Sequence, residues 1–210
     1  MIIVTGTKRS GTSMWMQILG AAGIERIGEA FPSNWSDTLR EANPRGFFES
    51  PLRRGIYYAT NPDPRSGAYY DPSATRQSAV KVFAPGLVRA DLAFVDRVVA
   101  TVRDWREYIG SMARLRSIER RAARAGSAVP RLPAHLEWWS ENLALVRDAH
   151  LRRYPIRWVS YDRVRSDPDE AARVLAWLGV DASREALHPI DATLCTQRTD
   201  ADDDVRVPER

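Results

Sequence analysis

Residues 1–15 read MIIVTGTKRSGTSMW, and this stretch decides the fold. The β-branched apolar run at its start predicts a buried strand, and the apolar residues from Trp15 to Ala22 recur at helical spacing. Between them lies a loop with two glycines, Gly6 and Gly11, and several hydroxyls and cations. Such a loop favours an oxyanion, because the first amides of a helix have no partner within it and glycine lets the backbone come close.

The loop differs from the ATP-binding P-loop at one decisive position. The spacing of Gly6 and Gly11 fits the G-x-x-x-x-G-K-[ST] pattern, but Thr12 stands where that pattern has its lysine. The cations lie inside the loop instead, at Lys8 and Arg9. The loop therefore suits an anion, and it does not suit a nucleoside triphosphate bound with magnesium.

Composition limits the class of protein. With 210 residues we expect one domain, 1–210, in which about 200–210 form a frayed tail. The single cysteine, Cys195, excludes an internal disulfide and a multi-cysteine zinc site. A net charge of +4 suits an anionic ligand without choosing between a small molecule, nucleic acid and a membrane surface. We expect no signal peptide, no membrane span and a cytoplasmic protein.

Strands and helices alternate along the chain. Apolar runs predict strands at 1–4, 79–83, 97–102 and 156–161, with a weak edge strand at 23–28. Apolar periodicity predicts helices at 15–22, 105–115, 136–150 and 168–178, and a short one at 52–60. Loops are predicted at 29–50 and at 61–78, the latter over the site. The chain is therefore predicted to be α/β, with a central parallel sheet and helices on both faces.

A second anion site is predicted after the strand at 97–102. Arg103 leaves that strand at the edge where ligands bind in parallel sheets, and Ser111 follows eight residues later on the next helix. A guanidinium and a hydroxyl from these places can converge on one phosphate. The alternative is an arginine paired with Asp104 or with another carboxylate at the sheet edge. Two anion sites on one edge suggest a ligand with two separated anionic groups.

These motifs resemble those of sulfotransferases that use 3′-phosphoadenosine 5′-phosphosulfate (PAPS). Residues 8–13 resemble the family's 5′-phosphosulfate-binding loop in its bacterial Arg-Ser-Gly-Thr-Ser form, and Arg103 with Ser111 resembles its 3′-phosphate-binding motif. Residues 43–49, NPRGFFE, resemble a segment common in bacterial members, and residues 158–179 resemble the family's late strand and helix. The resemblance implies a P-loop NTPase-like sulfotransferase architecture.

The resemblance also implies roles for the loop residues. The backbone from Ser10 through Gly11 to Ser13, with Arg9 and neighbouring Lys8, would hold the phosphosulfate, and the Thr12 and Ser13 hydroxyls would add bonds. Arg9 would stabilise charge on the leaving oxygen.

At the other phosphate, Arg103 and Ser111 would hold the 3′-phosphate, and Arg198 is the candidate late basic residue. A hydroxyl or amine would then attack sulfur in line, and no metal is required.

The base that takes the acceptor's proton is left open between two carboxylates. Family members with a catalytic histidine carry it where this chain has Phe83, so histidine is excluded there. Glu29 has the spacing of the glutamate in tyrosylprotein-type members, and Glu49 is the other carboxylate near an expected site loop. Lys81 would contact the bridging oxygen or the acceptor, or else form an inward salt bridge.

Two other functions would also fit a basic chain with a glycine loop. A small-molecule kinase would need a loop lysine and a carboxylate for magnesium, and a basic nucleic-acid-binding module would rest on the charge alone. Three histidines have no metal-ligand spacing, and His150 is expected in the core. Trp35 is a candidate contact for the acceptor or adenine. The acceptor is left open between a small molecule, a lipid and a glycan, with no nucleic acid as partner and the oligomeric state undetermined.

Overall fold

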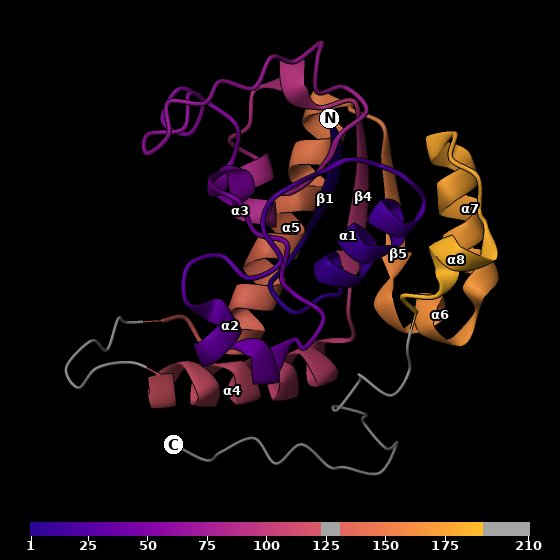
Figure 1. Cartoon of the computed structure of the whole chain (residues 1–210). Helices are drawn as coiled ribbons and strands as arrows, with labels where there is room; N and C mark the ends of the chain where they lie inside the picture. Colours follow the sequence, from indigo (N-terminus) through magenta and orange to yellow (C-terminus); the bar gives the residue numbers. More distant parts are fainter. Residues whose placement is uncertain (123–130, 191–210) are drawn as a thin grey trace.

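Five parallel strands form the centre of the molecule (Figure 1). The computed structural model describes residues 1–122 and 131–190, so Cys195, Arg198 and the predicted tail lie outside the described residues. The strands are β1 (Ile2–Gly6), β2 (Arg26–Ile27), β3 (Ala79–Lys81), β4 (Arg97–Val102) and β5 (Ile156–Ser160), in the order β2-β3-β1-β4-β5. Every pairing between them is parallel, which confirms the predicted fold class.

Helices cover both faces of this sheet and one of its ends (Figure 1). The α-helices are α1 (Thr12–Ala21), α2 (Trp35–Thr38), α3 (Ala84–Leu87), α4 (Trp105–Ala122), α5 (Ala134–Arg152), α6 (Tyr161–Ser166), α7 (Pro168–Leu178) and α8 (Arg184–Leu187). Three short 3₁₀ turns are η1 (Arg40–Ala42), η2 (Pro51–Arg54) and η3 (Leu92–Phe94). The four longer predicted helices are confirmed, whereas the segment predicted as a loop at 29–50 contains α2 and η1. The helix predicted at 52–60 is wrong beyond η2, because Gly55 has a φ of 114° and ends it.

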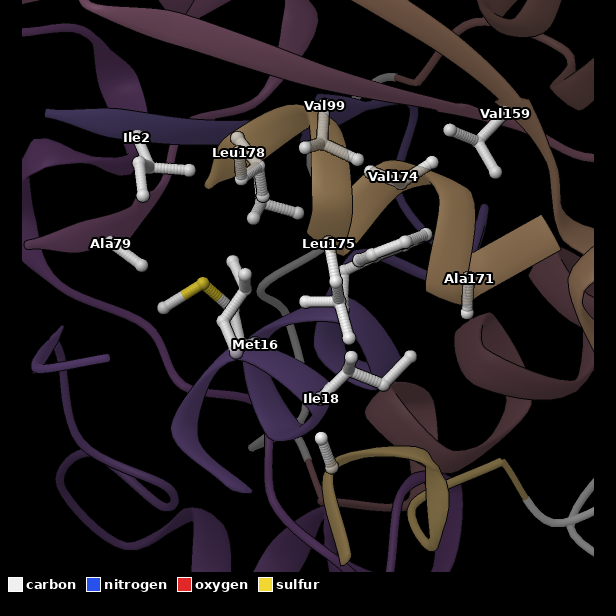
Figure 2. Close-up of a cluster of buried hydrophobic side chains, with 14 of the residues drawn as sticks. Ile2, Met16, Ile18, Ala79, Val99, Val159, Ala171, Val174, Leu175 and Leu178 are labelled. Carbon is white, nitrogen blue, oxygen red and sulfur yellow. The ribbon is translucent and has the colours of Figure 1, made fainter. Parts of the chain in front are cut away.

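The strands bury both of their faces because alternate side chains point to opposite sides. Ile2, Val99 and Val159 face the side covered by α1 and α7, where Leu175 packs against them (Figure 2). On the opposite side, apolar strand residues pack with residues of α3 and α5; these strand residues are Ile3, Val80, Val98 and Ala100. The sheet is thus the middle of three layers.

Helix α5 presents a different face to the core from the one its sequence predicts. The apolar stripe expected inside is exposed, with 47% of Leu136, 61% of Trp139, 69% of Leu143 and 51% of Val146 accessible. His150 is also exposed, so its expected place in the core is wrong. Leu145 is buried instead, against residues of β1 and α3. Helical periodicity shows where the apolar residues of a helix line up, but it does not show which side of the helix packs against the rest of the protein. In α5 the side that packs inward carries both polar and apolar residues.

The carboxyl ends of β1 and β4 lie side by side at the point where the chain changes direction across the sheet. After β1 the chain enters α1 on one face, and after β4 it enters α4 and then α5 on the other. Crevices at such points are where open parallel sheets bind ligands. The two predicted anion motifs, at the ends of these two strands, therefore share one crevice.

Candidate active site

The loop between β1 and α1 is held in shape by its own hydroxyls and by two glycines. A Cβ on Gly6, whose φ is 143°, would lie 2.4 Å from the carbonyl oxygen of Thr101, so β4 approaches too closely for any other residue. The Ser10 hydroxyl lies 2.8 Å from the Thr7 carbonyl oxygen and 2.8 Å from the Thr101 hydroxyl. The Ser10 side chain therefore fixes the loop to β4. The following helix begins at Thr12, so its first amides point into the turn.

Arg9 joins the two predicted anion motifs. Its Nε donates to the Oγ of Ser111 on α4 over 3.0 Å, and its own carbonyl oxygen accepts from Nη1 of Arg103 over 3.2 Å. Arg9 has a φ of 65°, a conformation that a non-glycine residue rarely adopts and that functional loops often contain. The loop, the end of β4 and α4 therefore meet at one point, as the sequence predicts.

Arg103 is buried and forms an ion pair with Glu107, not with Asp104 as the sequence suggested. Its Nη2 lies 3.0 Å from Oε2 of Glu107, one turn into α4, rather than against Asp104. Burial raises the pKa of Glu107, with a further contribution from Asp162, and Arg103 opposes that rise. The guanidinium also lies over the ring of Tyr161 at 4.7 Å. Arg103 is thus held in place at the sheet edge from several sides.

Tyr161, the first residue of α6 after β5, belongs to this site although the sequence analysis did not single it out. Its ring fills the space beside Gly11, where an added Cβ would lie only 2.4 Å from Cδ2 of the ring. Tyr161 also lines the main cavity. Its position at the end of the strand predicted at 156–161 is the signal in the sequence that points to it.

Lys81 lies at the end of β3 and is the buried centre of a polar cluster. Its side chain is 2% exposed, and Nζ lies 2.8 Å from Oε1 of Glu49 and 3.2 Å from Oγ of Ser13. It also donates to the Phe47 carbonyl oxygen, and the second oxygen of Glu49 lies 3.3 Å from Arg53. Burial lowers the pKa of Lys81, while Glu49 opposes that change. The inward salt bridge is therefore present, and it ties the first loop to residues 47–53.

Glu29 and Glu49, the two candidate bases, are paired through their backbones but differ in exposure. The amide of each donates to the carbonyl oxygen of the other over 3.0 Å. Glu49 is buried and lines the cavity, whereas Glu29 is exposed and is not part of its lining. The geometry therefore brings Glu49, and not Glu29, to the other site residues.

A cavity of about 730 Å³ opens at this edge of the sheet, a volume typical of small-molecule sites. Of the predicted site residues, its lining includes Lys8, Arg9, Gly11, Thr12, Ser13, Glu49, Lys81 and Arg103. Trp35 and Phe83 also line it, as does Tyr57. None of residues 61–78 does, so the expectation that this loop lies over the site is wrong. The loop is tied instead to the opposite end of the sheet, where Arg76 pairs with Asp96 and Ser78 with Glu25.

One wall of the cavity carries carboxylates that the sequence analysis missed. Glu119 on α4 and Glu137 and Glu141 on α5 line it, together with the cations of the first loop and of residues 53–54. Glu137 and Glu141 were missed because the apolar stripe of α5 was expected to face inward, which would have turned these two carboxylates toward solvent. The cavity is therefore lined by both cations and carboxylates.

Similarity to known proteins is found at the level of solved structures. A comparison with protein-family models and with curated protein sequences finds no match. Similar structures include the sulfotransferase domain from the Synechococcus PCC 7002 olefin synthase, at 16% identity and a TM-score of 0.44, covering 93% of this chain and 78% of that one. Another is the sulfotransferase domain from the curacin biosynthetic pathway, at 12% identity and a TM-score of 0.48, covering 94% and 80%.

Within 1–122 and 131–190, no three histidine, cysteine, aspartate or glutamate side chains are grouped as a metal ion would need. No helix in this part of the chain is long and apolar enough to cross a membrane.

Proposed function

We propose that this chain transfers a sulfuryl group from PAPS to a hydroxyl or amine of a small acceptor. The observation that carries the proposal is the meeting of Arg9, Arg103 and Ser111 beside the glycine loop. A helix N-terminus and two guanidiniums at one end of a cavity suit a ligand with two anionic groups. Adenosine 3′,5′-bisphosphate and its 5′-sulfated form have this pattern, whereas the groups of ATP lie in one chain.

The residues of the loop would hold the 5′-phosphosulfate. Gly6 and Gly11 let the loop pack closely against β4 and Tyr161, and the amides from Gly11 to Ser13 would donate to the oxygens of the phosphosulfate. Arg103 and Ser111 would hold the 3′-phosphate, with the Arg9 contact to Ser111 setting the distance between the two groups. Arg198 stays a candidate for this phosphate, outside the described residues.

Catalysis would then depend on position and charge. An acceptor in the cavity attacks the sulfur in line, and the bond from sulfur to the bridging oxygen breaks. Arg9 is the cation of the loop that would stabilise charge on that oxygen. With cations already at the site, we expect the reaction to need no metal ion. Lys81 would act mainly as an organiser, because Glu49, Ser13 and Phe47 already occupy its ammonium group.

The volume and lining of the cavity favour a small acceptor over a polymer. At about 730 Å³ it also has to accommodate part of the donor. Trp35, Phe47 and Tyr57 offer aromatic surface, which would suit an apolar molecule, a lipid tail or a sugar ring.

Radiolabelled PAPS offered with a library of alcohols, phenols and amines in EDTA tests this proposal. We expect transfer of label to at least one acceptor by the wild type, and a loss of at least about 100-fold in Arg9→Ala, which removes the charge at the leaving oxygen. Metal-dependent turnover of ATP without any transfer from PAPS would contradict the proposal and favour a kinase.

A further inference from the structure

One carboxylate in the wall of the cavity is neither ion-paired nor hydrogen-bonded at its buried oxygen. Glu119 pairs with Arg131, and Glu137 pairs with Arg116 over 2.9 Å. Glu141 lines the same wall, and within the part of the chain that the structure describes its Oε2 is buried and has no hydrogen-bond partner. A buried polar atom without a partner is costly in a folded protein, and functional sites are where such atoms are retained.

Helix α5 is fixed to Arg103, at the end of β4, close to this carboxylate. Nε1 of Trp138 donates to the carbonyl oxygen of Arg103 over 3.0 Å. Glu141 follows Trp138 by three residues, which places the two side chains on the same face of the helix. The position of Glu141 is therefore set relative to the residue that would hold the 3′-phosphate.

The charged groups around Glu141 come from three elements. Glu137 lies on its own helix, Tyr108 faces both glutamates from α4 together with Arg116, and Lys8 approaches from the first loop. Burial and the charge of Glu137 raise the pKa of Glu141 to about 7, with Lys8 opposing the rise. A carboxyl group with this affinity for protons can accept one and release it near neutral pH.

The two carboxylates considered from the sequence are less suited to this task. Both oxygens of Glu49 are engaged by cations, one by Lys81 and the other by Arg53. Glu29 is exposed and does not line the cavity. Among the four carboxylates of the lining, Glu141 is the one for which the described residues provide no ion pair and no hydrogen bond to Oε2.

We propose that Glu141 is the general base of the reaction, taking the proton of the acceptor's hydroxyl or amine as it attacks. This inference rests on the proposed sulfuryl transfer. In the step, the acceptor oxygen or nitrogen forms a bond to sulfur, and the bond from sulfur to the bridging oxygen breaks with its electron pair left on the 5′-phosphate. The acceptor's proton passes to the carboxylate of Glu141, and from there to solvent after the product leaves.

A titration tests the state of Glu141 without any need for an acceptor. In protein labelled with ¹³C at the glutamate carboxyls, NMR should show one carboxyl that titrates near pH 7 in the wild type and is missing from Glu141→Gln. If no carboxyl titrating above pH 6 disappears in this variant, the proposal is overturned. Binding of adenosine 3′,5′-bisphosphate is measured on the same samples. Its absence in the wild type would contradict sulfuryl transfer itself, whereas normal binding without the titration would contradict only the role of Glu141.

Kinetics with an acceptor from the library then separate a base from a residue that only shapes the cavity. Glu141→Gln should lower kcat by at least about 100-fold, leave the KM for PAPS within about threefold, and remove the acid limb of the pH profile. Glu141→Asp should restore part of the rate. The matched control is Glu41→Gln, an ion-paired carboxylate outside the cavity lining, which should keep both rate and profile. An unchanged acid limb in Glu141→Gln would overturn the proposal.

Discussion

The guanidinium of Arg9 and the hydroxyl of Ser111 lie 3.0 Å apart, although 102 positions of the sequence separate them. Arg9 belongs to the loop after β1 and Ser111 to the helix after β4. Each motif alone is a common way to hold an anion. Their contact brings the two motifs together beside the cavity that Arg9 and Arg103 line, and this arrangement is the basis for proposing a donor with two phosphate positions.

Removal of Arg103 should weaken the binding of adenosine 3′,5′-bisphosphate. Arg103→Ala loses a charged donor at the proposed 3′-phosphate, and such bonds contribute about 1.5–3 kcal/mol, so Kd should rise by about 10- to 150-fold in calorimetry. The control is Arg106→Ala, which removes the same charge from an exposed position on the next helix. An equal loss in both variants would mean that long-range charge, and not the site, holds the ligand.

The ion pair between Lys81 and Glu49 should show itself in stability. Glu49→Ala leaves a buried ammonium without its carboxylate and should cost about 3–5 kcal/mol in urea unfolding. Arg53→Ala removes the more exposed partner of Glu49 and should cost at most about 1 kcal/mol.

The double variant Lys81→Met, Glu49→Leu tests whether the loss of stability in Glu49→Ala comes from the unpaired ammonium group of Lys81. It removes both charges, so much of the lost stability should return. If Glu49→Ala is as stable as the wild type, the pair contributes nothing and Lys81 is held by its other contacts.

The sequence predicts the sheet and the anion loop well because both depend on short-range patterns. Val98 and Val99 lie in an uninterrupted apolar run, which a strand buried on both faces requires. Glycine is required at positions 6 and 11, because a Cβ atom on Gly6 would clash with β4 and one on Gly11 would clash with Tyr161. Chain order alone then brings Arg103 to the same edge as the loop.

The wall of the cavity could not be predicted because it depends on which face of α5 meets the rest of the chain. Two stripes of α5 are available, one through Leu136 and Leu143 and the other through Glu141 and Leu145. The first is more apolar, yet the second is covered by α3, α4 and β1. The periodicity of the sequence does not determine which stripe is buried. The place of Glu141 in the cavity wall and the exposure of His150 could therefore not be inferred from it.

Two leucines on α5 test this orientation. Leu145→Ala removes a fully buried side chain and should cost about 2–5 kcal/mol of unfolding free energy. Leu143→Ala, only two residues away and 69% exposed, should change stability by less than about 0.5 kcal/mol. Equal losses in chemical denaturation would indicate that the apolar stripe is covered.

Glu141 should give the stability of the protein a distinctive dependence on pH. Its pKa rises from 4.5 in the unfolded chain to about 7 in the folded protein, so the folded state holds the proton more tightly between these values. The contribution of Glu141 to the free energy of unfolding is therefore fully present below pH 4.5 and is lost as the pH rises through 7. The loss is at most about 3 kcal/mol.

The comparison that checks this dependence is between the wild type and Glu141→Gln. The variant cannot lose a proton here, so it should gain stability relative to the wild type between pH 5 and pH 8 in urea unfolding. A difference that stays constant over this range would contradict the assignment.

Calorimetric titration with adenosine 3′,5′-bisphosphate in EDTA tests the central claim most directly. The arrangement of Arg9, Arg103 and Ser111 predicts one site per chain, tighter for this ligand than for adenosine 5′-monophosphate, which lacks the 3′-phosphate. Binding of ATP with magnesium and none of the bisphosphate would contradict the claim.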